Sequence, residues 1–209
     1  SLKALIIEQA IAREALRLSF QQHKEFAVEL KGVQQKRTIS DAFEQSSSGE
    51  TLVNLMKLDM LVGSGGVLSH APRRNQAARM LIDAFLPEGI TQLAVDSIFM
   101  MPQLGMLSTI HAKAAIEVFE KDCLIHLGTC IAPVGPQKPE KPVLTYECLL
   151  PNEKLEGTLM SGELKLIPVP YKQIQVKLSP SKGLDVGAGK NEIFSTNVYG
   201  GEVGIMLDG

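Results

Sequence analysis

The sequence has few of the residues that hold metals or cross-link a chain. It contains three cysteines, an odd number, and the spacings of Cys123, Cys130 and Cys148 match no zinc or disulfide pattern. Its four histidines are scattered, and none starts the i, i+4 pair that a helical metal site uses. We therefore expect reduced, mostly buried thiols and no metal site.

Long apolar runs and blocks of like charge are also missing. No apolar run approaches the roughly 20 residues that span a bilayer. The formal net charge is -2, and no cluster of Lys and Arg stands out as a nucleic-acid surface. These absences predict a cytoplasmic protein that takes neither nucleic acid nor a membrane as a partner.

The chain is long enough for one large domain or two small ones. With 209 residues, of which 44% are hydrophobic and 21% charged, it has the composition of a globular protein. It begins without an initiator methionine and stops after Leu207-Asp208-Gly209, in an apparent strand. We expect an excised C-terminal fragment.

The predicted elements divide the chain into three parts. Residues 1–133 alternate helical periodicity with buried, strand-like runs, which predicts an α/β layer. Residues 134–142 form a stiff, proline-rich linker. Residues 143–209 are short β-prone runs separated by turns, which predicts a small all-β domain, a barrel or sandwich. The expected helices cover 2–22, 51–57, 72–85 and a segment from Gln103 onward, and the expected strands cover 26–30, 60–62, 91–96, 124–131, 143–149, 154–160, 164–169, 174–178, 193–199 and 203–207.

The first predicted helix carries an apolar stripe at helical spacing. Its charged residues lie off the stripe, as on an amphipathic surface helix. We expect the stripe to face the core; its members are Ala4, Ile7, Ile11, Ala15 and Leu18.

A glycine turn stands between a predicted strand and a predicted helix. The apolar run that ends at Val62 gives way to Gly63, Ser64, Gly65 and Gly66, and Pro72 opens the helix that follows. In such an arrangement backbone N–H groups and a helix N-terminus can meet a phosphate or a sugar. A plain tight turn is the alternative.

Three charged residues near this turn are candidate ligand groups. Asp96 ends an apolar strand, where α/β proteins often place ligand-facing groups, but it could instead cap the next helical turn. Arg73 and Arg74 could clamp an anion at the helix start, or could lie on a solvated face. No nucleophile and base pair accompanies them, so the sequence predicts no catalytic constellation.

A second glycine-rich segment, 183–190, has the wrong spacing for a phosphate loop. The glycine that such a loop needs five residues before Gly189 is replaced by Leu184, and Asn191 stands where Ser or Thr should follow Lys190. We expect a hairpin connection.

Four segments resemble the glutamate mutase MutL-type family, which is distinct from the mismatch-repair protein of the same name. They are LVGSGGVLSHAP at 61–72, LAVDSIFMMPQLG at 93–105, HLGTCIAP at 126–133 and GGEVGIMLD at 200–208. Proteins of this family are encoded beside adenosylcobalamin-dependent mutases. The family is similar to the actin, sugar kinase and heat-shock chaperone superfamily of ATPases. The resemblance therefore implies the C-terminal lobe of an actin-like ATPase fold, followed by the small all-β domain.

The same resemblance implies a nucleotide site that this chain completes only in part. Gly63, Gly65 and Gly66 would meet the adenosine part of ATP or ADP, and the helix start from Ala71 to Arg74 would lie behind them. The phosphate loops and the acids that position magnesium would belong to an upstream lobe, so the chain alone should not hydrolyse ATP.

The function that the resemblance implies is ATP-dependent reactivation or assembly of an adenosylcobalamin-dependent mutase or aminomutase, such as glutamate mutase. That mutase is the expected partner, and a homo-oligomer is possible. Two alternatives stay open: a metabolite kinase or hydantoinase-like enzyme of the same superfamily, and an interaction module that needs no nucleotide.

Overall fold

The structure is a computed structural model that describes residues 1–27, 52–150 and 153–209. Of the strand predicted at 26–30, residues 28–30 lie outside these residues, whereas Phe26 ends the first helix and Ala27 is its C-cap, so these two residues are not part of a strand. The elements follow one another as α1 (Leu2–Phe26), η1 (Leu55–Lys57), β1 (Met60–Gly63), α3 (Gly66–Ser69), α4 (Arg74–Phe85), β2 (Gly89–Asp96), α5 (Met101–Val118), η2 (Phe119–Cys123), β3 (Leu124–Ala132), β4 (Pro142–Leu149), β5 (Lys154–Met160), β6 (Leu164–Ile167), β7 (Gln173–Pro180), β8 (Phe194–Tyr199) and β9 (Gly204–Asp208).

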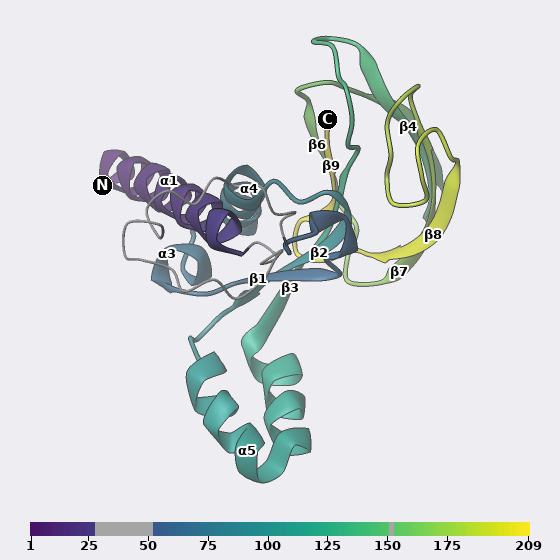
Figure 1. Cartoon of the computed structure of the whole chain (residues 1–209). Helices are drawn as coiled ribbons and strands as arrows, with labels where there is room; N and C mark the ends of the chain where they lie inside the picture. Colours follow the sequence, from purple (N-terminus) through teal and green to yellow (C-terminus); the bar gives the residue numbers. More distant parts are fainter. Residues whose placement is uncertain (28–51, 151–152) are drawn as a thin grey trace, which may run out of the picture.

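Two sheets carry the fold, and with the helices they confirm the mixed α/β class (Figure 1). The first sheet has the order β1-β2-β3-β9-β6. In it β1 runs parallel to β2, and β3 runs parallel to β9, whereas the other neighbours are antiparallel. The second sheet is antiparallel throughout, with the order β5-β4-β7-β8.

Strands from the predicted β domain are shared between the two sheets. β6 and β9 complete the first sheet, where β9 pairs with β3 from Gly128 to Ile131. One apolar core also joins the sheets, because Ile131 of β3 and Ile205 of β9 pack with Tyr146 and Val176 of the second sheet. A domain boundary at 134–142 would therefore separate strands of the first sheet and residues of the core that joins the two sheets.

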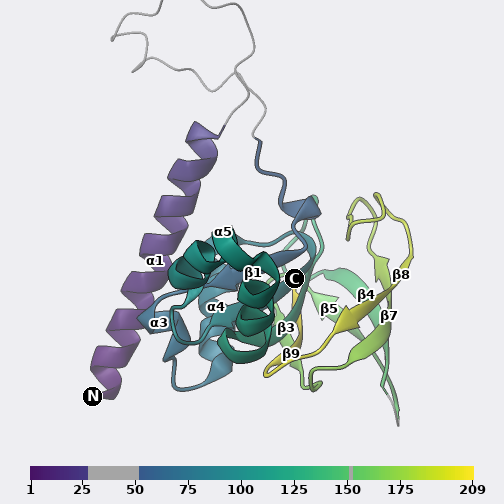
Figure 2. The ribbon, with the colours of Figure 1, turned by 90° about the horizontal axis from the view of Figure 1, so that it is seen from below.

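The other face of the first sheet is covered by helices. Leu81 of α4 packs against Leu93 and Leu127 of the sheet, and α1 lies on the outer side of α4 (Figure 2). A tilted ring pair, Phe20 with Phe85, and an ion pair between Arg13 and Asp83 at 2.8 Å fix α1 to α4.

The apolar stripe expected to face the core from α1 is in fact exposed. The stripe residues are all exposed, and the side that meets the body carries Leu5, Ala12, Leu16 and Phe20 instead. The helix is apolar on two sides, so periodicity alone could not say which side the single neighbour α4 would cover.

The helix predicted from Gln103 onward is broken into two arms. His111 has φ -146° and ψ 79°, which no helix accommodates, and its ring nitrogen accepts the backbone N–H of Ala114 at 3.1 Å. This bond stands in for a helix cap and starts the second arm, which continues into η2. The resulting helical hairpin, residues 101–123, projects from the sheet between β2 and β3 (Figure 1).

Within the described residues, no helix has both the length and the apolar character needed to cross a membrane.

Candidate functional site

The glycine turn lies at one edge of the first sheet, beside the end of the neighbouring strand. β1 and β2 are parallel, and Gly63 pairs with Val95, so the turn after β1 and Asp96 at the end of β2 meet at the same edge. The parallel register thus brings together two predicted site features that are about 30 residues apart in sequence.

Glycine is needed at positions 63 and 65 for two different physical reasons. At Gly63 an added Cβ would lie 2.8 Å from the side chain of Leu68 and 3.0 Å from that of Leu81, so the close packing of α3 and α4 requires glycine there. Gly65 has φ 107° and ψ 156°, a region that only glycine adopts without strain. An added Cβ at Gly65 would meet nothing within 4 Å, so the turn opens toward free space.

The Asp96 carboxylate is buried and caps the start of the hairpin. It accepts the backbone N–H groups of Ile98 and Met100 at 3.3 Å and of Met101 at 3.2 Å, and the Ser64 hydroxyl lies 3.5 Å away. These contacts are those of the capping alternative, in which the carboxylate satisfies the free N–H groups of a helix start.

The two arginines are placed differently. Arg74 donates to the Ser69 carbonyl at 2.8 Å and so ties the end of α3 to α4. Arg73 is exposed, and its backbone N–H donates to the Gln76 side chain at 3.1 Å. Ser69, which the sequence analysis missed, is buried and donates to the carbonyls of Gly65 and Asp96 at 3.0 and 2.5 Å. Its hydroxyl links the turn to the end of β2.

An open pocket of about 520 Å³, the glycine-turn pocket, lies over these residues. It is lined by Gly65, Gly66, Ser69, His70, Ile98 and Phe99. In the described parts of the chain no acceptor is recorded for the backbone N–H of Gly65 or Gly66, which leaves both free to bind a polar ligand. Ile98 and Phe99 are more than half exposed and add an apolar surface to these donors.

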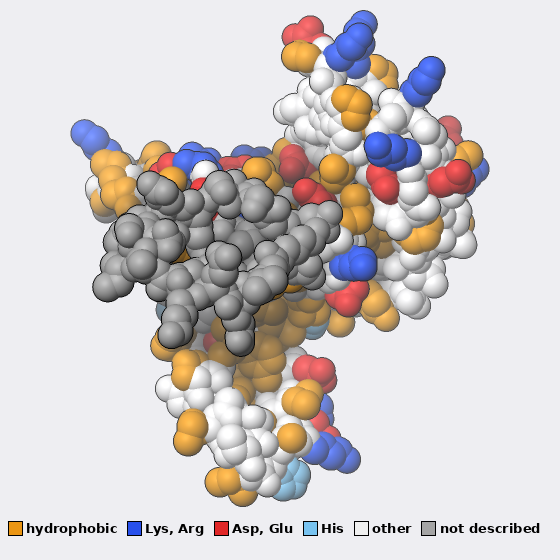
Figure 3. Space-filling view, viewed as in Figure 1, with side chains coloured by type: hydrophobic (Ala, Val, Ile, Leu, Met, Phe, Trp, Pro, Cys, Tyr) orange, Lys and Arg blue, Asp and Glu red, His pale blue; other side chains and the backbone are white. Residues whose placement is uncertain are grey.

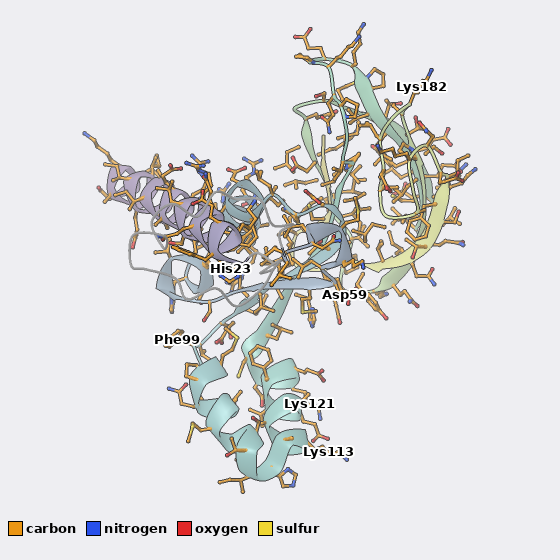
Figure 4. The ribbon with its side chains drawn as sticks, viewed as in Figure 1. His23, Asp59, Phe99, Lys113, Lys121 and Lys182 are labelled. Carbon is orange, nitrogen blue, oxygen red and sulfur yellow. The ribbon has the colours of Figure 1, made fainter. Side chains whose placement is uncertain are left out.

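Phe99 was not singled out from the sequence, although a signal exists. It lies in an apolar run, 98–101, directly after the polar end of β2. Its φ of 57° places a bulky residue in the left-handed region, and Figure 4 shows it where the hairpin leaves the sheet. Backbone strain of this kind gathers at functional sites more often than elsewhere.

The second glycine-rich segment is closed by its own carboxylate. Asp185 Oδ1 accepts the backbone N–H of Gly187 at 2.7 Å and that of Gly189 at 3.0 Å. A phosphate would need the same two donors, so this segment is a connection between β7 and β8, as expected from its spacing.

The three thiols are buried, and burial raises the pKa of each, to about 11 for Cys148. They are therefore protonated at neutral pH and are poor nucleophiles. No group of three or more His, Cys, Asp or Glu side chains that could hold a metal ion occurs among the residues that the structure describes.

A family model described as MutL protein matches residues 1–123, which is more than half of the chain and includes the glycine turn, Asp96 and the hairpin. Neither the curated proteins nor the solved structures contain a match to this chain.

Proposed function

This chain belongs to the MutL protein family, and from that premise we propose that it is part of a nucleotide-dependent factor that reactivates or assembles an adenosylcobalamin-dependent mutase such as glutamate mutase. The family match supports the association with a mutase. The nucleotide dependence rests on a single observation, the open pocket over the glycine turn.

The glycine-turn pocket offers what an adenosine moiety would need. Free N–H groups at Gly65 and Gly66 can bind polar atoms of the ligand, and the exposed Phe99 ring offers a surface for a base. No lysine or arginine is among the described residues that line the pocket, so we place the phosphates of ATP or ADP outside it. Arg73, exposed at the start of α4, is our candidate for binding them.

The mechanism that we propose is a population shift. A ligand changes a conformational equilibrium only to the extent that it binds the two states differently. The glycine turn, the start of α4 and the start of the hairpin are connected through Ser69, Arg74 and Asp96. Nucleotide at the turn would therefore alter the hairpin position, and with it a surface that contacts the mutase.

Deleting residues 136–209 is not a suitable test of this proposal. The deletion would remove β6 and β9 from the first sheet and open the shared core, so loss of mutase binding would report unfolding. A single substitution at the turn is a more specific test than this deletion. Gly66 is exposed, has no positive φ, and an added Cβ there would lie 4.0 Å from His70, so a side chain fits without strain.

The experiment combines calorimetric titration of ATP and ADP with binding to purified glutamate mutase, for the full-length protein and its Gly66→Val variant. We expect the variant to bind nucleotide about tenfold more weakly, which is about 1.4 kcal/mol, and to lose the difference in mutase affinity between ATP and ADP. The matched control is Ala4→Val, which adds bulk at an exposed position of α1. Mutase affinity that is equal in all nucleotide states of the wild type would contradict the proposal.

A further inference from the structure

A second pocket, of about 970 Å³, lies between the helical hairpin and the second sheet. We call it the hairpin pocket. Its floor is the first sheet, with Met60, Gln92 and His126, and its walls come from Leu104 and Phe119 of the hairpin and from Tyr171 and Tyr199 of the other side. Figure 3 shows hydrophobic side chains gathered where the hairpin leaves the sheet. The volume is at the upper end of the range for small-molecule sites.

The pocket lies beside the part of the first sheet that the second sheet covers. Ile90 and Ile131 on this face pack under the second sheet. Gln92 is two residues along β2 from Ile90, so its side chain lies on the same face, beyond the edge of that cover. The hairpin projects from the sheet beyond Asp96, and the pocket is lined by residues of the hairpin, of the first sheet and of the side that carries Tyr171 and Tyr199.

Three aromatic rings stack along one wall. His126 lies 4.3 Å from Tyr171, and Tyr171 lies 5.7 Å from Tyr199, between ring centroids, with interplanar angles of 17° and 27°. Tyr171 is 54% exposed, and all three rings line the pocket, so the row offers aromatic surface to it. Such a surface suits a planar ring, because stacking a base on aromatic side chains contributes about 1–3 kcal/mol.

The polar groups of the pocket suit a neutral heterocycle. The Gln92 side chain shows no hydrogen bond to another described residue, and its amide offers a donor and an acceptor side by side, the pair that Gln uses to bind adenine. Burial lowers the pKa of His126, against the opposing effect of Glu120, so at neutral pH its ring has one donor and one acceptor. The described lining residues include Glu120 and neither lysine nor arginine, which disfavours a ligand with phosphates.

Gly105 is a glycine that neither conformation nor packing requires. It lies inside α5, where glycine costs about 1 kcal/mol relative to alanine. Its φ is not positive, and an added Cβ would meet nothing within 4 Å. It lines the hairpin pocket, so the missing side chain enlarges the space there.

We propose that the hairpin pocket binds a purine nucleoside, with its base against the aromatic row and the Gln92 amide. This site is separate from the glycine-turn pocket and does not depend on the function proposed above. The base would be held by stacking, by the paired polar atoms of Gln92 and by the neutral His126 ring. ATP would bind here more weakly than adenosine, because its phosphates would lie near Glu120 without a cation.

The experiment uses adenosine and follows the imidazole proton resonances of the four histidines by NMR. One histidine reports on each pocket, His126 on the hairpin pocket and His70 on the glycine-turn pocket. His23 and His111 lie outside both and are internal controls. We expect saturable shifts at His126 with adenosine, and weaker binding at this histidine with ATP.

Two variants test whether the shift arises from the pocket. Gly105→Leu fills the space and improves helix propensity, so it should fold and lose the His126 shift. Ala112→Leu places the same leucine side chain at an exposed hairpin position that is not among the lining residues of the pocket, and it should keep the shift. Gln92→Leu should weaken adenosine about tenfold through the lost polar pair, about 1.4 kcal/mol.

Several outcomes would overturn the proposal. The first is a His126 resonance that does not shift at millimolar adenosine, and the second is a His126 shift that persists in Gly105→Leu. The third is a His126 shift that self-association of the chain causes in the absence of adenosine. A response at His70 alone would overturn the hairpin pocket and leave the glycine-turn proposal standing. A response of His126 to adenosine with no response of His70 to ATP would support the hairpin pocket and contradict the glycine-turn proposal.

Discussion

Two loops of this chain are rich in glycine, but they differ in whether a described residue accepts a hydrogen bond from their backbone N–H groups. At Gly63–Gly66 the backbone N–H groups of Gly65 and Gly66 have no acceptor among the described residues, and a pocket lies over them. At Gly183–Gly189 the equivalent donors are taken by Asp185, which is only two and four residues away. Each loop has a carboxylate nearby, but the two carboxylates are used differently.

The difference lies in what each carboxylate caps. Asp96 reaches the glycine turn through Ser64 at 3.5 Å, yet its stronger contacts are to the start of the hairpin. Asp185 has no helix to cap, so it folds back on its own loop. A glycine-rich loop is a ligand site only where its donors are left free, and nearby acidic residues decide that.

The largest effect that tests this comparison is expected from Asp96→Ala. The change leaves three backbone N–H groups at the partly buried start of the hairpin without their acceptor. We expect a loss of unfolding free energy on the order of 3 kcal/mol, measured by urea denaturation. Asp96→Asn keeps one acceptor oxygen and should lose less. Equal losses for the two variants would mean that the carboxylate does not act through these bonds.

A smaller effect is expected from Gly65→Ala beside its neighbour Gly66→Ala. Gly65 has φ 107°, so alanine there should cost about 2 kcal/mol of stability through backbone strain. Gly66 has an ordinary φ and opens α3, so alanine there should leave stability nearly unchanged. Thermal unfolding of the two variants measures the contrast. A stability loss at Gly66→Ala as large as that at Gly65→Ala would show that both glycines are structural.

The smallest effect is expected from Asp185→Ala in the closed loop. The loop is at the surface, and two of its N–H groups would exchange the carboxylate for water, at a cost of about 1 kcal/mol. Amide hydrogen exchange at Gly187 and Gly189 should accelerate, with Asp185→Asn intermediate. Nucleotide affinity should stay at the wild-type value, and any loss of it would show that the two loops are coupled.

Local sequence signals located most of the secondary structure. The strands expected at 60–62, 91–96, 124–131 and across 143–207 correspond to β1–β9, because short alternating or fully apolar runs between turn residues have few other solutions. The glycine turn was predicted for the same reason. Gly65 at φ 107° confirms that glycine is needed there.

Which surfaces meet could be known only from the folded arrangement of the elements. Periodicity marked α1 as amphipathic but could not choose between its two apolar sides, and the position of α4 made that choice. Strand character at 164–169 and 203–207 could not reveal that β6 and β9 join the first sheet, because pairing between distant strands depends on a shared core. The break at His111 depends on one side chain that accepts a backbone N–H.

The two pockets also differ in how far the sequence alone could predict them. The turn chemistry at Gly63–Gly66 could be predicted from the local sequence, since backbone conformation is a local property. The hairpin pocket joins Gln92, His126, Tyr171 and Tyr199, which lie far apart in the chain, and no local pattern connects them. They come together because the hairpin and the second sheet lie on either side of the same part of the first sheet, an arrangement that exists only in the folded molecule.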